Sequence, residues 1–143
     1  MSKVSIIYWS GTGNTEAMAY YIAEGAKEAG AEVNMVTADS ASAADVADVT
    51  AVALGCPSMG VEVLEETTME PLMCELDGAI SGKNVALFGS YGWGDGQWMR
   101  DWEGRVTGDG ATLVNGEGVI CNAAPDDGVA EQLKDLGRTL AGL

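Results

Sequence analysis

The chain has 143 residues, of which 22 are acidic, 7 are basic and none is histidine, so its formal net charge at pH 7 is −15. This charge argues against binding to nucleic acid or to an anionic membrane, and the lack of histidine removes the commonest acid–base group and metal ligand. The length predicts one domain, residues 1–143, with a sizeable core, and we expect a monomer.

The first predicted unit is a strand, a polar loop and a helix. Residues 4–9 are β-branched and aromatic, which indicates a buried strand. From residue 16 to about residue 29, apolar side chains recur at helical spacing. The loop between them therefore lies at the amino end of a helix, where free N–H groups and the helix dipole favour an anion.

The composition of this loop narrows the choice of anion. It contains no lysine, which an ATP-type phosphate loop needs, and Glu16 stands where the dinucleotide fingerprint has its third glycine. Hydroxyls, an amide and flexible glycine backbone remain, and these suit a terminal monophosphate. The alternative is a simple helix cap of small polar residues. The candidate phosphate-binding residues are Ser10, Gly11, Thr12, Gly13, Asn14 and Thr15.

The middle of the chain continues the alternation of strands and helices. Residues 32–37 are a predicted strand, residues 38–48 a loop with a short helix, and residues 50–55 a wholly buried strand. Residues 65–79 are helical in character, with Pro71 near the start of the regular part.

The remainder of the chain begins with a fourth predicted strand, residues 84–90. Apolar residues between 98 and 106 recur at helical spacing, and residues 112–114 and 119–122 are short β-like pieces. The last helix covers about residues 126–141.

Five strands alternating with helices predict an α/β fold, a parallel sheet with helices on both faces. Ligands of such sheets lie at the carboxyl ends of the strands. In the strand order 2-1-3-4-5, the polar loops after strands one, three and four are neighbours, so we expect them to form one site.

Aromatic and polarisable side chains in the two later loops indicate a planar ligand. Met59 and Trp93 lie on turns flanked by glycine rather than on a helical face, and both could cover a flat ring; the alternative for each is packing. A planar heterocycle joined to a monophosphate describes flavin mononucleotide (FMN). Trp9 is expected to be a wall beside the phosphate and Cys56 a packing residue. Trp98 and Trp102 are expected in the core or on the helix surface.

Three segments, residues 9–16, 54–60 and 88–96, together resemble the flavodoxins, especially the short-chain type from anaerobic bacteria. The resemblance spans the whole chain and implies a flavodoxin-like three-layer fold with sheet order 2-1-3-4-5, the order for which flavodoxin is the standard example. It implies that Ser10, Thr12, Asn14 and Thr15 bind the phosphate of non-covalently held FMN. The other residues implied at the cofactor are Pro57, Ser58, Met59, Gly60, Val61, Glu62, Ser90, Tyr91, Gly92, Trp93, Gly94 and Asp95.

The same resemblance implies particular roles at the ring. Met59 would cover its inner face and Trp93 its outer face, the Gly60 carbonyl would face N5, and Glu62 would bond N3. Val61 departs from the family pattern, in which Asp, Ser or Gly is usual. In a type II turn Val61 would need a positive φ, which a β-branched residue tolerates poorly.

The function that the resemblance implies is a low-potential, one-electron carrier. It would shuttle between the semiquinone and hydroquinone of FMN and serve partner oxidoreductases with basic docking surfaces. The alternative is an FMN-dependent oxidoreductase of the quinone-reductase type, which usually needs longer loops. A receiver domain is rejected because Trp9-Ser10 and Cys56-Pro57 stand where it needs acidic residues.

The location of the protein is predicted from its cysteines and from its hydropathy. Three cysteines without a C-x-x-C pair are typical of reduced thiols. We see neither a signal peptide nor an apolar run of the roughly 20 residues that span a bilayer. We therefore expect a cytoplasmic protein that does not associate with membranes.

Overall fold

The structure of this chain is a computed structural model that describes residues 2–143. Its strands are β1 (Lys3–Tyr8), β2 (Glu32–Thr37), β3 (Ala51–Gly55), β4 (Asn84–Tyr91), β5 (Thr112–Leu113) and β6 (Val119–Asn122). Its helices are α1 (Asn14–Glu28), α2 (Ala44–Ala47), α3 (Met69–Leu76), α4 (Gln97–Gly108) and α5 (Asp127–Ala141), with single 3-10 turns η1 (Ala38–Ser40) and η2 (Val114–Gly116).

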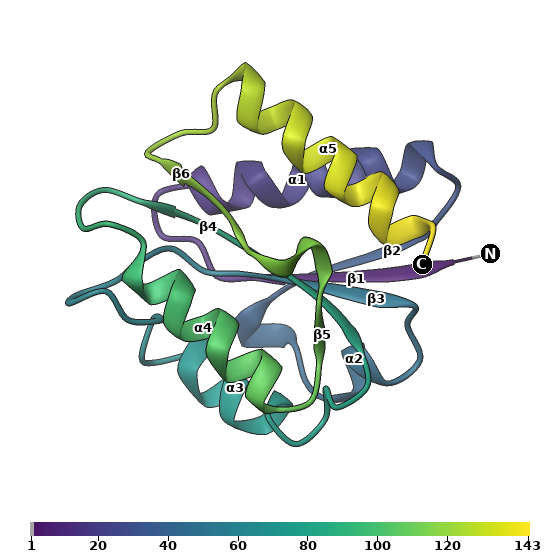
Figure 1. Cartoon of the computed structure of the whole chain (residues 1–143), viewed down its shortest axis with the longest axis horizontal. Coiled ribbons are helices and arrows are strands. Elements are labelled where there is room, and N and C mark those ends of the chain that lie inside the picture. Colours follow the sequence, from purple (N-terminus) through teal and green to yellow (C-terminus); the bar gives the residue numbers. More distant parts are fainter. Residues whose placement is uncertain (1) are drawn as a thin grey trace.

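A parallel sheet forms the middle layer, with α1 and α5 on one face and α3 and α4 on the other (Figure 1). The strand order is β2-β1-β3-β4-β5, and β6 also pairs with β4, so the fifth strand consists of two pieces. Asn115 and Gly116, with φ of 63° and 76°, make the turn that separates these pieces. The predicted order 2-1-3-4-5 is confirmed.

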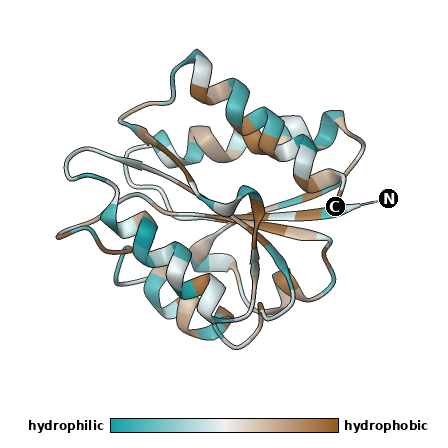
Figure 2. Ribbon diagram, in the orientation of Figure 1, coloured by the Kyte–Doolittle hydropathy of each residue, from teal (hydrophilic) through white to brown (hydrophobic). Residues whose placement is uncertain are grey.

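Alternation along the strands divides the core into two apolar layers. In β1, Ile6 packs toward α1 and α5, while the next residue, Ile7, packs toward α3 and α4, because successive side chains of a strand point to opposite faces of the sheet. Trp98 and Trp102 are each 1% exposed, so of the two predicted places, the core or the helix surface, they occupy the core. Figure 2 shows the hydrophobic colouring concentrated on the strands and the inner sides of the helices. Within residues 2–143, no helix is long and apolar enough to cross a membrane.

Two predicted helix starts are corrected by the structure. Helix α1 begins at Asn14 and not at residue 16, so two loop residues belong to its first turn. Helix α3 begins at Met69 and not at residue 65, because the Glu65 carboxylate accepts hydrogen bonds from the N–H groups of Thr67, Thr68 and Met69. These bonds form a separate turn before the helix.

An ion cluster joins α3 to α4 on the outer side of the molecule. The Arg105 guanidinium donates to Glu70 and to Asp77, in each case at 2.8 Å, and these bonds hold the pKa of both carboxyls below their usual range although burial opposes it. Asp109 lies beside Asp77. A hydrogen bond with Asp77, burial and the Asp77 charge raise the pKa of Asp109 to about 6.

We predict that Asp109→Asn makes the protein more stable at pH 8 and leaves its stability unchanged near pH 4. An unfolded aspartate has a pKa of about 3.9, and the folded value of about 6 is higher. The folded state therefore disfavours the ionised carboxylate of Asp109, so the free energy of unfolding of the parent falls as the pH rises from about 4 to 6. Urea unfolding at both pH values measures the effect, with the exposed Asp48→Asn as a matched control. Equal stabilities of parent and Asp109→Asn at pH 8 would contradict it.

Candidate functional site

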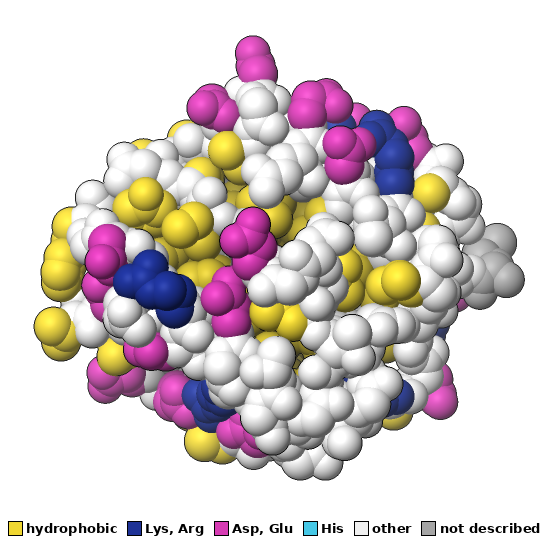
Figure 3. Space-filling model, viewed as in Figure 1, with side chains coloured by type: hydrophobic (Ala, Val, Ile, Leu, Met, Phe, Trp, Pro, Cys, Tyr) yellow, Lys and Arg dark blue, Asp and Glu magenta, His cyan; other side chains and the backbone are white. Residues whose placement is uncertain are grey.

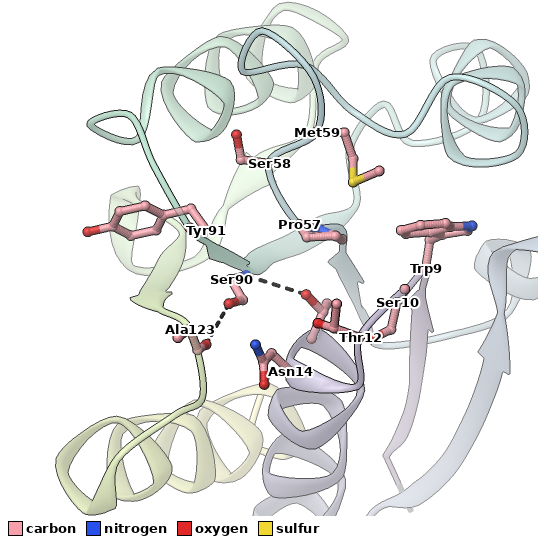
Figure 4. Close-up of a pocket in the computed structure, with 13 residues that line it drawn as sticks. Trp9, Ser10, Thr12, Asn14, Pro57, Ser58, Met59, Ser90, Tyr91 and Ala123 are labelled. Carbon is pink, nitrogen blue, oxygen red and sulfur yellow. Dashed lines mark hydrogen bonds between the residues drawn. The ribbon is translucent and has the colours of Figure 1, made fainter.

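A cavity of about 310 Å³ lies at the carboxyl ends of the strands, within the size range of small-molecule sites. The loops after β1, β3 and β4 all contribute to its wall, as predicted from the strand order. Figure 4 shows Trp9 and Met59 on one side of it, Tyr91 on the other, and Thr12 and Asn14 at the start of α1. Its lining residues are Trp9, Ser10, Gly11, Thr12, Asn14, Thr15, Pro57, Ser58, Met59, Ser90, Tyr91, Gly92 and Ala123.

The start of α1 forms the polar end of the cavity. Ser10 Oγ accepts hydrogen bonds from the N–H groups of Gly13 and Glu16, both at 3.2 Å, so Ser10 does cap the helix as the alternative interpretation supposed. Gly13 itself has a left-handed φ of 98°, which favours glycine. Asn14 and Thr15 lie in the first turn, where backbone N–H groups have no intrahelical partner and the dipole favours negative charge.

The walls of the cavity are apolar and carry no positive charge. Trp9, Pro57, Met59 and Tyr91 supply ring, pyrrolidine and thioether surfaces, and no lining residue is Lys or Arg. Trp9 is thus a wall residue, as predicted. An apolar slot that ends at hydroxyls and unpaired helix N–H groups matches the two parts of FMN, a planar heterocycle and a phosphate. The donor set therefore fits this cofactor.

Hydrogen bonds from the chain after β3 fix its position beside β4 and α4. Cys56 N–H donates to the Phe88 carbonyl at 3.1 Å, Ser58 N–H to the Ser90 carbonyl at 3.0 Å, and Trp98 Nε1 to the Cys56 carbonyl at 3.0 Å. Burial raises the pKa of the Cys56 thiol to about 12. Cys56 is fully buried and neutral, so its predicted packing role is confirmed.

Beyond the cavity, residues 59–63 form a small hairpin, in which Met59 and Val63 exchange two backbone hydrogen bonds of 2.9 Å. Positive φ in this turn falls on Gly60 and Glu62, at 51° each, and not on Val61. The turn in this structure is therefore not the type II turn in which strain is expected at Val61, and the Val61 side chain is 82% exposed at its tip.

Several of the predicted site residues lie outside the cavity wall. Gly60, Val61, Glu62, Gly94 and Asp95 belong to two loops beside it, and the side chain of Glu62 reaches the start of α4. Trp93, at the tip of the loop after β4, is 63% exposed.

The sequence interpretation missed Ala123. It follows β6, accepts a hydrogen bond from Ser90 Oγ, and donates its N–H to the Tyr91 carbonyl at 2.9 Å. The pairing of β6 with β4 places the loop after β6 at the same edge of the sheet, and this topology was the available signal.

Comparison with known proteins identifies the family of this chain. Residues 6–135 match the flavodoxin family. The chain is 46% identical to flavodoxin from Megasphaera elsdenii over 96% of this chain and 98% of that protein, and 44% identical to flavodoxin from Clostridium beijerinckii over 98% and 100%. The solution structure of two-electron reduced Megasphaera elsdenii flavodoxin aligns with a TM-score of 0.89, covering 98% of this chain and 99% of that one, at 46% identity.

Proposed function

The chain belongs to the flavodoxin family, and from this premise we infer that it is an FMN-binding electron carrier and not an enzyme. The observation that carries this inference is the cavity where three loops and the start of α1 meet. Bound FMN supplies the chemistry, taking up and releasing one electron at a time, while the protein sets its surroundings. We propose that residues 1–143 form a single FMN-binding domain.

We propose that the start of α1 holds the phosphate. The hydroxyl of Thr12, the amide of Asn14 and the N–H groups of the first turn all lie at this end of the cavity. Ser10 shapes the loop by accepting two backbone hydrogen bonds. The buried hydroxyl of Thr15 accepts from Ser90 N–H at 3.4 Å and so joins the start of α1 to the end of β4.

The ring is proposed to lie between the loops after β3 and β4. Met59 would cover one face, as its position in the wall allows, and Trp93, at the exposed tip of the loop after β4, would cover the other. The Gly60 carbonyl would accept from N5 and Glu62 from N3. Because no Lys or Arg lines the cavity, the protein offers little to stabilise added negative charge, and this favours a low potential for the second electron.

Turnover measurements separate the carrier from the quinone-reductase alternative. The FMN-loaded protein, mixed with NADH and a quinone, is expected to oxidise NADH no faster than free FMN does. Addition of a flavoprotein reductase should then allow electrons to pass through the protein to an acceptor. Rapid NADH oxidation by the protein alone would support the enzyme instead.

We further propose that partners dock through basic surfaces. Acidic side chains outnumber basic ones over the chain, 22 to 7, and they are spread widely over the face in Figure 3. The three cysteines are free thiols, which supports a reducing, cytoplasmic location, and we propose a monomer without membrane association.

We predict that electron transfer to a basic oxidoreductase slows as salt is added. Attraction to a protein with a charge of −15 extends over a Debye length of about 10 Å at 0.1 M salt and shortens as the ionic strength rises. Stopped-flow rates between about 0.01 and 0.5 M salt measure the effect, with a neutral small-molecule oxidant as the control. Rates that do not change over this range would show that the negative charge contributes only to solubility and does not attract partners.

A further inference from the structure

Glu62 connects the two loops that flank the proposed ring site. It lies in the 59–63 hairpin after β3, yet its Oε1 atom accepts hydrogen bonds from Gly96 N–H at 3.1 Å and Gln97 N–H at 2.8 Å. Both donors belong to the end of the loop after β4 and the start of α4. A single carboxylate thus joins two segments that are 34 and 35 residues apart in the chain.

The start of α4 depends on this carboxylate for its cap. The residue at the N-cap position is Gly96, which has no side chain to accept from the first turn, so Glu62 takes this role from a different loop. A negative charge at this end of a helix is also favoured by the dipole. Both hydrogen bonds use Oε1, so these contacts leave Oε2 unused.

Gly94 provides the space that the carboxylate occupies. A Cβ atom on Gly94 would lie 2.6 Å from Glu62 Cδ and 2.8 Å from Oε1, so the flexible end of the Glu62 side chain would have to move away. Gly94 also has a left-handed φ of 89°. The loop that carries Trp93 is therefore shaped around the Glu62 side chain.

We propose that Glu62 is a positioning residue that fixes the separation of the Met59 hairpin and the Trp93 loop before the cofactor binds. The inference rests on the proposed function, in which the ring lies between these loops. It adds a second role to Glu62: one oxygen caps α4, and the other remains for the ring. Because the capping contacts join only groups of the protein chain, they can hold the two loops together independently of the cofactor, and binding then needs less ordering of these loops.

Amide exchange in the FMN-free protein tests this role directly. In the parent, the Gly96 and Gln97 amides should exchange slowly, and Glu62→Ala should speed both by at least about tenfold, as expected for loss of a hydrogen bond to a charged group. Glu62→Gln, which keeps an accepting oxygen, should restore part of the protection. Glu66→Ala removes a neighbouring exposed carboxylate and should leave both amides unchanged.

FMN affinity of a Gly94→Ala variant tests whether displacing the Glu62 carboxylate from the start of α4 weakens binding. This variant keeps the Glu62 carboxylate but displaces it from α4, and it should bind FMN at least about tenfold more weakly. Gly82→Ala is the matched control, since Gly82 has a φ of 78° with nothing within 4 Å of the added Cβ. It should bind FMN as the parent does.

The two possible failures are distinguishable. If the Gly96 and Gln97 amides exchange equally fast in the parent and in Glu62→Ala, or if Gly94→Ala binds FMN as tightly as Gly82→Ala, the positioning role is wrong. If the parent itself does not bind FMN, the proposed function fails, whatever the exchange results are.

Discussion

FMN is expected to bind at least about a hundredfold more tightly than riboflavin, because two hydrogen bonds to a charged group contribute roughly 1.5 kcal/mol or more each. Riboflavin has the same ring and ribityl chain but lacks the phosphate. The difference therefore measures what the start of α1 contributes through neutral donors alone. Fluorescence titration of both flavins gives the two dissociation constants.

A threonine variant tests whether the difference in affinity between FMN and riboflavin comes from the loop before α1. Thr12→Ala should weaken FMN by about 1–3 kcal/mol and leave riboflavin unaffected. Thr12 is the better test position, because Thr15 also accepts a hydrogen bond from Ser90 N–H. Thr107→Ala, which removes a hydroxyl that bonds only its own helix, is the control. Equal binding of FMN and riboflavin by the parent would show that the loop holds no phosphate.

The second large effect is expected from Gly137→Ala, which should destabilise the fold by about 2 kcal/mol. An added Cβ on Gly137 would lie 2.1 Å from the Ile22 carbonyl oxygen of α1, and one on Gly25 would lie 1.9 Å from the Lys134 carbonyl oxygen of α5. The helices must separate, at a cost near or above the usual overpacking maximum of about 3 kcal/mol. The higher helix propensity of alanine relative to glycine offsets only about 1 kcal/mol of this cost.

Gly104→Ala in α4 is the matched control for this prediction. Nothing lies within 4 Å of a Cβ at Gly104, so only the propensity gain remains and this variant should be more stable than the parent. In urea unfolding, Gly137→Ala should therefore lower the free energy of unfolding and Gly104→Ala should raise it, although both are Gly→Ala changes inside helices. A Gly137→Ala protein as stable as Gly104→Ala would show that α1 and α5 adjust without cost.

The parts of the fold with strong periodicity could be predicted from the sequence. The sequence predicts the second strand at residues 32–37, and it is observed as Glu32–Thr37, because its bounds depend on local pattern and on a helix that ends before it. The convergence of the three loops followed from strand order alone. These features need no knowledge of individual side-chain contacts.

Features that depend on particular tertiary contacts could not be predicted. The start of α3 depends on where the Glu65 carboxylate bonds, and the φ values of the 59–63 hairpin depend on the two bonds between Met59 and Val63. Ala123 enters the site only because β6 pairs with β4. The capping role of Glu62 needs Gly94 and Gly96 in three dimensions. Sequence spacing carries no signal for these features, except that the predicted pairing of the fifth strand with the fourth could have indicated Ala123.

Anaerobic reductive titration of the FMN-loaded protein, followed by absorbance, tests the electron-carrier function most directly. We predict that bound FMN is reduced in two separate one-electron steps, with a long-wavelength band from the one-electron-reduced flavin rising and then falling. Reduction of the bound flavin in a single two-electron step, or the absence of any bound flavin after incubation with FMN and gel filtration, would contradict this function.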